Sequence, residues 1–134
     1  MTALMGCEAS GRERLERLPE ADLYYPGSET LADGGNDRTQ GISGFTQAGR
    51  WVILGTDETL EEVHAFYQTE LAERGWEEGP RSRSTSEIAG YTWDHGGTQL
   101  RLSFKDTEQW YQRLEGSDQF ATLYEVRLVE MVEP

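Results

Sequence analysis

The chain has 134 residues, of which 36% are hydrophobic, and its aromatic residues are four Trp, six Tyr and four Phe. This length is typical of a single domain, and so much large apolar surface excludes a disordered chain. Twelve Lys and Arg against 25 Asp and Glu give a net charge of −13, which disfavours nucleic acid as a partner because the field repels phosphates.

The N-terminal segment contains the only cysteine, Cys7, which excludes an intramolecular disulfide and a multi-cysteine metal site. The preceding Leu4-Met5-Gly6 resembles the lipobox of bacterial lipoproteins, where a Leu three positions before Cys and a small residue just before it direct acylation. The resemblance implies a lipid on Cys7 and a polar tether over residues 1–20, followed by one domain over residues 21–134. Residues 13–18 allow a helical turn or two within that tether, ended by Pro19.

Export to the cell envelope requires a signal peptide, with a cationic start and an apolar stretch of about 7–15 residues. Only six uncharged residues precede Cys7, so this interpretation requires a start upstream of Met1. The alternative is a cytoplasmic protein with a free thiol. No run of 18 apolar residues occurs, so the sequence predicts no transmembrane helix.

The domain is predicted to begin with an extended Tyr24-Tyr25-Pro26-Gly27. Residues 28–38 contain Asp33-Gly34-Gly35-Asn36-Asp37, a density of turn formers that predicts a mobile surface loop. Calcium binding by this loop is an alternative, but the spacing of an EF-hand and its closing Glu are absent. No metal or cofactor is therefore predicted.

The next two segments, 41–46 and 50–55, flank Gln47-Ala48-Gly49 and predict a β-hairpin with Gly in its turn. Four consecutive bulky apolar residues in the second segment leave neither face polar. This is typical of a central strand covered by a helix on one side.

A helix is predicted over residues 59–74, because apolar residues recur at helical spacing. Thr59 followed by Glu62 has the spacing of a capping box, Asp57 is a rival N-cap, and Gly75 suits the C-terminal cap. Trp76 is expected to fold back onto the apolar stripe. The members of that stripe are Leu60, Val63, His64, Tyr67 and Leu71.

The C-terminal half predicts a hairpin of residues 88–93 and 98–105 across residues 94–97, an insertion over 106–119 and a last strand over 120–132. In the second strand of the hairpin, apolar and polar residues alternate, so one face is expected to be wet. The predicted inward residues are Leu100, Leu102, Phe104, Tyr124, Val126 and Leu128, and the predicted wet ones are Gln99, Arg101, Ser103 and Lys105. The sum is an α+β fold: a single antiparallel sheet in β-β-α-β-β-β order, with one amphipathic helix packed across one face.

Two motifs resemble small bacterial lipoproteins of unassigned function: Tyr25-Pro26-Gly27, and a helix of the form V-x-x-F-Y-x-x-x-L-x-x-x-G-W over residues 63–76. The resemblance covers residues 24–76 and implies a fold and an envelope location. It implies no activity and no catalytic residues.

Catalytic motifs are absent: the sequence has no GxSxG, HExxH, CxxC, P-loop or GxGxxG. The two imidazoles are His64, on the apolar stripe, and His95, which follows Asp94 in a Gly-rich turn. Of these, only His95 together with Asp94 is a candidate site for a weak hydrolase or a metal-binding enzyme.

Binding candidates are aromatic and acidic. Trp110, Tyr111 and Trp93 are the aromatics least explained by the core, and exposed aromatics commonly anchor protein interfaces. Residues 57–78 hold eight acids against one Arg, a net of −7, so this helix is predicted to present an acidic face, which is either a solvated surface or a docking face for a basic partner. Glu61, Glu62 and Glu73 are its candidate contacts.

Three functions follow from these features. The first is a non-catalytic, lipid-anchored envelope domain that binds a protein partner or helps assemble a membrane complex. The second is an acidic immunity-type inhibitor of a basic toxin, and the third is the weak hydrolase or metal-binding enzyme.

Overall fold

The computed structural model describes residues 11–41, 44–81, 87–105 and 119–131. Cys7, Trp110 and Tyr111, which the sequence identifies as a lipidation site and as binding candidates, lie outside the described residues. The helices are α1 (Gly11–Glu16), a 3-10 turn (Pro19–Asp22) and α2 (Leu60–Glu73). The strands are β1 (Glu29–Asn36), β2 (Thr39–Gly41), β3 (Gly44–Thr46), β4 (Gly49–Thr56), β5 (Glu77–Glu78), β6 (Glu87–His95), β7 (Thr98–Lys105) and β8 (Thr122–Glu130).

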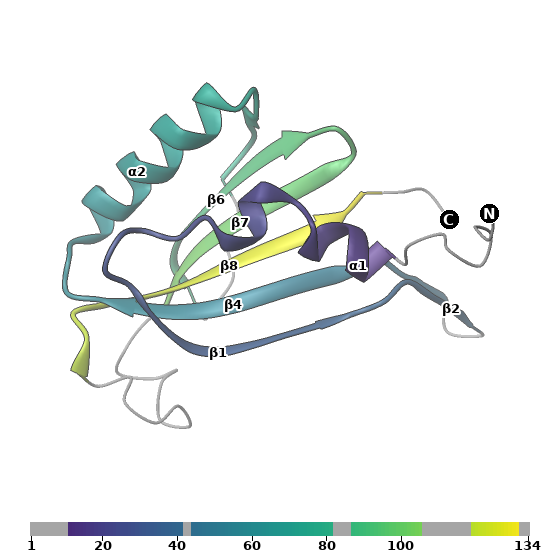
Figure 1. Ribbon diagram of the computed structural model, residues 1–134, viewed down its shortest axis with the longest axis horizontal. Coiled ribbons are helices and arrows are strands. Elements are labelled where there is room, and N and C mark those ends of the chain that lie inside the picture. The colour runs from purple at the N-terminus through teal and green to yellow at the C-terminus, as the bar shows by residue number, and fades with distance from the viewer. Residues whose placement is uncertain (1–10, 42–43, 82–86, 106–118, 132–134) are drawn as a thin grey trace.

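Six strands form one antiparallel sheet in the order β1-β4-β8-β7-β6-β5, and α2 packs across one of its faces (Figure 1). The five long strands and α2 follow each other as β-β-α-β-β-β along the chain. The predicted α+β fold is therefore confirmed. β2 and β3 form a separate two-stranded ribbon.

The predicted first hairpin is wrong in its pairing. β4 pairs with β1, which lies in the segment predicted as a mobile loop, whereas residues 39–46 supply both strands of the small ribbon. A strand holds Gly34 because the indole of Trp51, its partner on β4, lies over it: a Cβ there would meet a ring carbon at 2.5 Å. The ring supplies the contact that the glycine lacks, and an edge strand tolerates glycine more easily than a central one.

Helix α2 has the ends that the sequence predicts. The Thr59 hydroxyl accepts a hydrogen bond from the Glu62 backbone N–H at 3.2 Å, so Thr59 and not Asp57 is the N-cap. At the other end, Gly75 adopts a φ of 85°, and the Trp76 N–H donates to the Leu71 carbonyl at 2.9 Å. The side chain of Trp76 joins the core, as predicted.

The core lies between α2 and one face of the sheet. The helix contributes Val63, Tyr67 and Leu71, all fully buried. The predicted inward residues of β7 and β8 are buried beside them, together with the central residues of β4 and β6. The sheet residues of the core are Val52, Leu54, Tyr91, Trp93, Leu100, Leu102, Phe104, Tyr124, Val126 and Leu128.

The described part of the predicted tether, residues 11–20, is packed on the same face of the sheet as α2. Leu15 of α1 is buried in the core, and the Arg50 guanidinium of β4 donates to the Ala21 carbonyl at 2.9 Å. The helical turn expected before Pro19 is present as α1. Residues 11–20 thus belong to the packed domain, because apolar Leu15 and Ala21 complete its core, and only residues 1–10 remain assigned to a tether by prediction.

The β6–β7 hairpin turns at Gly96 and Gly97 alone, with φ values of 56° and 82°, so the strands are longer than predicted. Lys105 was predicted on the wet face of β7, but it is buried and its Nζ lies 3.3 Å from a Glu125 oxygen on β8. An ion pair explains the difference, since a buried ammonium needs an opposite charge.

The Tyr-Pro-Gly segment turns through Gly27, whose φ is 86°, and the Ser28 N–H donates to the Tyr25 carbonyl at 3.0 Å. Tyr124 of β8 fixes this turn: its hydroxyl accepts from the Tyr25 N–H at 3.2 Å and lies 2.6 Å from the Ser28 hydroxyl. Burial raises the pKa of Tyr124, although the hydrogen bonds with Ser28 and Tyr25 oppose this. The Tyr-Pro-Gly motif, on which the family resemblance partly depends, therefore has a structural role, because it attaches the start of β1 to β8.

Candidate partner-binding surface

The outer side of α2 carries carboxylates that no core contact requires. Glu62 and Glu73 are both exposed and lie eleven residues apart, so they share one helix face about 16 Å from each other. Glu61 is exposed on a neighbouring face. Together with the exposed acids that flank the helix, they form what we call the acidic surface, composed of Asp57, Glu58, Glu61, Glu62, Glu73, Glu77 and Glu78.

The cation at the C-terminal end of α2 is already paired. Arg74, at the C-terminal end of α2, lies 3.1 Å from a Glu20 oxygen and 3.5 Å from a Glu70 oxygen. Glu20 is buried against the domain, so this contact turns the guanidinium toward the 3-10 turn. The charge of Arg74 therefore offsets Glu20 and Glu70 rather than the acidic surface.

The acids are most crowded at the N-terminal end of α2. Hydrogen bonding with Glu62 and the negative charge of that residue raise the pKa of Glu58, with smaller effects of burial and Asp57. The Tyr25 hydroxyl donates to Glu62 at 3.4 Å, and partial burial and the charges of Glu62 and Glu58 raise the pKa of Tyr25. Carboxylates that repel each other in this way favour an incoming cation. Neither Glu58 nor Tyr25 was predicted as a contact of this surface, although the spacing of four residues between Glu58 and Glu62 is a usable signal.

The prediction that Trp93 is an exposed binding residue is wrong. Its side chain is buried on the core face of β6, 6.1 Å from the ring centroid of His64 and 6.4 Å from that of Tyr91. The alternation of β6 directs Tyr91 and Trp93 to the same face, and that face is covered by α2. A surface partner cannot reach this indole in the folded domain.

The Asp94–His95 candidate lies beside a shallow cavity of about 160 Å³ at the β6–β7 turn, whose lining includes Glu77, Thr98 and Met131. The imidazole of His95 stacks on Trp76 with centroids 5.2 Å apart, and the Gln99 amide donates to Asp94 at 3.4 Å. In the part of the chain that the structure describes, no three His, Cys, Asp or Glu side chains gather as metal ligands. The geometry brings no nucleophile and base together here, and the enzymatic alternative stays a prediction.

His64 is a core contact, as its place on the apolar stripe predicts. Its ring stacks on Tyr91 with centroids 3.6 Å apart and an angle of 19° between the rings. Its Nε2 is buried and has no hydrogen-bond partner among the described residues. Burial lowers the pKa of His64, Glu78 raises it in part, and Arg81 lowers it further.

The segment predicted as a mobile loop, for which calcium binding was an alternative, is strand β1 followed by a short connection to β2. The Asn36 side-chain amide donates to the Gln47 carbonyl at 2.8 Å, and Asp37 accepts from the Arg38 N–H at 2.8 Å. Their polar atoms therefore serve the chain's own backbone.

No protein-family model, curated protein or solved structure matches this chain. Within the described ranges, none of the helices has the length and the apolar composition needed to cross a membrane.

Proposed function

We propose that this chain is a lipid-anchored, non-catalytic domain of the cell envelope that binds a basic protein partner through the acidic surface. The observation that carries the proposal is the set of seven exposed acids on and around α2, beside which Arg74 is paired with other carboxylates. Such a surface steers a cationic partner and sets the salt dependence of its association.

The crowding of Glu58 and Glu62 supports the same proposal. A cationic side chain that approached them would lower the pKa of Glu58 again, so binding would release a proton wherever that group is still protonated.

The position of α1 supports the anchor. Gly11 lies against Ala48 and Glu130, at the end of the sheet where β4 begins and β8 ends, whereas α2 follows the far end of β4. Gly11 comes four residues after Cys7, and an extended chain of that length spans at most roughly 14 Å. An acylated Cys7 would hold the α1 end of the domain close to the lipid and leave the N-terminal end of α2, with its acids, pointing away from it.

The anchor is tested in cells that express the full gene product. A labelled fatty acid should be incorporated into the wild-type protein and not into Cys7→Ser, and the variant should leave the membrane fraction. Membrane association that survives Cys7→Ser would show that the anchor is wrong.

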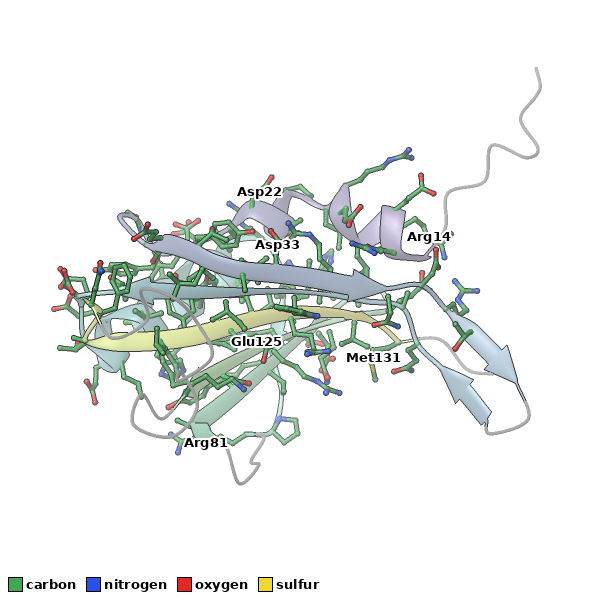
Figure 2. All side chains as sticks on the ribbon, turned by 90° about the horizontal axis from the view of Figure 1, so that it is seen from below. Arg14, Asp22, Asp33, Arg81, Glu125 and Met131 are labelled. Atoms are coloured by element: carbon green, nitrogen blue, oxygen red, sulfur yellow. The ribbon has the colours of Figure 1, made fainter. Side chains whose placement is uncertain are left out.

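The acidic surface is tested by two triple variants with the same change in net charge. Glu61→Lys, Glu62→Lys and Glu73→Lys reverse the surface, whereas Glu13→Lys, Asp22→Lys and Asp33→Lys reverse exposed acids near α1 and β1, where Figure 2 labels Asp22 and Asp33. Calorimetric titration with a short lysine-rich helical peptide at about 0.05 M and about 0.5 M salt measures the affinity. The first variant should bind at least about tenfold more weakly at low salt. Equal losses of affinity in both triple variants would show that net charge alone determines binding. This result would contradict the proposal that the acidic surface is the binding site.

The second candidate, an immunity-type inhibitor of a basic toxin, depends on the same acidic surface. It differs in needing no anchor, and its readout is inhibition of a toxin's activity at equimolar amounts. A protein that is not acylated but still loses binding in the first triple variant favours this candidate.

A further inference from the structure

The face of the sheet opposite α2 carries two arginines that lie directly opposite each other on neighbouring strands. Figure 1 places α2 above the sheet, so Figure 2, seen from below, looks onto the opposite face, where Glu125 is labelled on β8. Arg101 of β7 lies directly opposite Arg127 of β8, and Arg127 lies directly opposite Trp51 of β4. These residues alternate with the buried Leu100, Leu102, Val126 and Leu128, so they share the outer face.

Two like charges directly opposite each other destabilise a sheet, because the Cβ atoms of such a pair lie only about 5 Å apart. In a chain of net charge −13, two of the twelve cations nevertheless take this position. Both side chains remain accessible: Arg101 is half-buried, and the side chain of Arg127 is 38% exposed.

The polar contacts of the two arginines do not neutralise them. The Arg127 guanidinium donates to Glu125 at 2.9 Å, but that carboxylate also pairs with Lys105, whose Nζ is 3.3 Å away. The Arg101 Nε donates to the neutral side-chain oxygen of Gln99 at 2.6 Å, and no described carboxylate forms an ion pair with Arg101. Among the described residues, Glu125 is thus the one carboxylate that contacts the two arginines, which leaves a net charge of about +1 on the pair.

Both contacts hold the guanidinium groups in place. Gln99 donates through its amide to Asp94 at 3.4 Å, which directs its oxygen toward Arg101. Glu125 is buried and fixed by Lys105, so it offers Arg127 a rigid acceptor. Two chains of polar contacts therefore end on two adjacent arginines, each of which keeps N–H donors that these contacts do not use.

We propose that Arg101 and Arg127 form a binding site for an oxyanion, a phosphate or a carboxylate group. The planar guanidinium fork matches the geometry of both anions, and a shared anion would convert the repulsion between the two arginines into attraction. Trp51 of β4 stands opposite Arg127, with its indole over Gly34 of β1, so its indole N–H is a reporter next to the site. This site is independent of the acidic surface and of the anchor.

The experiment is an NMR titration of the guanidinium Nε–Hε and indole N–H signals, with inorganic phosphate in one series and malonate in the other at constant ionic strength. We expect the signals of Arg101, Arg127 and Trp51 to move together, with a dissociation constant on the order of 1 mM. A response to phosphate assigns a phosphoryl ligand, and a response to malonate a carboxylate ligand. If neither anion moves these signals, the proposal is wrong.

Two variants and a matched control complete the test. Arg101→Gln and Arg127→Gln should each weaken binding at least about tenfold, whereas Arg17→Gln, which removes an equal charge at a side chain 71% exposed, should not. In chloride, Arg101→Gln should melt no lower than the wild type, because it removes the repulsion. In phosphate, the melting temperature of the wild type should rise and that of Arg101→Gln should not. Binding that persists in both arginine variants would overturn the proposal.

Discussion

The carboxylate of Glu130, at the end of β8, accepts two hydrogen bonds from the guanidinium of Arg14, at 3.1 and 2.5 Å. Its other oxygen accepts from the Nε of Arg38 at 3.0 Å. Arg14 lies on α1 and Arg38 follows β1, so one buried carboxylate joins the start of the domain, its edge strand and its last strand. Burial raises the pKa of Glu130, but the hydrogen bonds and charges of Arg14 and Arg38 outweigh burial and lower the pKa overall.

Replacing this carboxylate should cost stability that depends on pH. We expect Glu130→Gln to lower the free energy of unfolding by about 2 kcal/mol at neutral pH, since bonds between charged partners are lost. The folded-state pKa lies below the unfolded one, so this stability is present above the unfolded pKa and is lost as pH falls through the folded pKa. Urea unfolding of both proteins between about pH 7 and pH 3 measures it. The control is Glu16→Gln, which removes an exposed pair with Arg12 and should cost under about 0.5 kcal/mol.

His64 should make the domain sensitive to acid. Burial lowers its folded-state pKa, so below the ordinary pKa of about 6.5 the unfolded chain binds more protons than the folded one. The free energy of unfolding therefore decreases as the pH is lowered. His64→Phe keeps a ring against Tyr91 and removes the buried, unpartnered Nε2. We therefore expect the variant to be as stable as the wild type or more stable at pH 7.5, and to lose less stability than the wild type on acidification to about pH 5.5. Parallel urea curves at the two pH values would contradict a role for this imidazole.

The contact between the Ser28 and Tyr124 hydroxyls should stabilise the Tyr-Pro-Gly turn. Tyr124→Phe removes the acceptor of the Tyr25 N–H as well as the partner of Ser28, so it should cost about 1–2 kcal/mol. Ser28→Ala should cost less, because the Tyr124 hydroxyl keeps its other partner. A double-mutant cycle from chemical unfolding should give a coupling energy of about 1 kcal/mol. Additive effects of the two changes would show that the 2.6 Å contact contributes nothing.

Trp93 should behave as a core residue. Its indole is buried between the sheet and α2, so Trp93→Ala should destabilise the domain by about 3–5 kcal/mol through the cavity that it leaves. Trp93→Phe, which fills most of that space, should cost clearly less. Fluorescence quenching by iodide measures the accessibility of the indole directly, in a protein whose other three tryptophans are replaced by Phe. Efficient quenching of the folded protein would return Trp93 to the surface and to the list of binding candidates.

The amino-acid sequence alone determined the elements whose signals are local. The stripe of Val63, Tyr67 and Leu71, the Thr59 cap and the Gly75 stop lie within one helix, so periodicity and capping rules were enough to predict α2 and its acidic side. The alternation in β7 and β8 predicted the inward face in the same way, because side chains of a strand alternate whatever its partner is.

Tertiary structure decided what depends on partners distant in the sequence. β1 is a strand because Trp51 covers Gly34 and β4 supplies the hydrogen bonds, and neither contact is visible in the turn-forming residues themselves. Trp93 is buried because α2 lies over it, and the buried charge of Lys105 is tolerated because Glu125 pairs with it. The facing of Arg101 and Arg127 is likewise a matter of register between two strands. Local sequence determines which way a side chain points along its own strand, whereas only the register determines what stands opposite it.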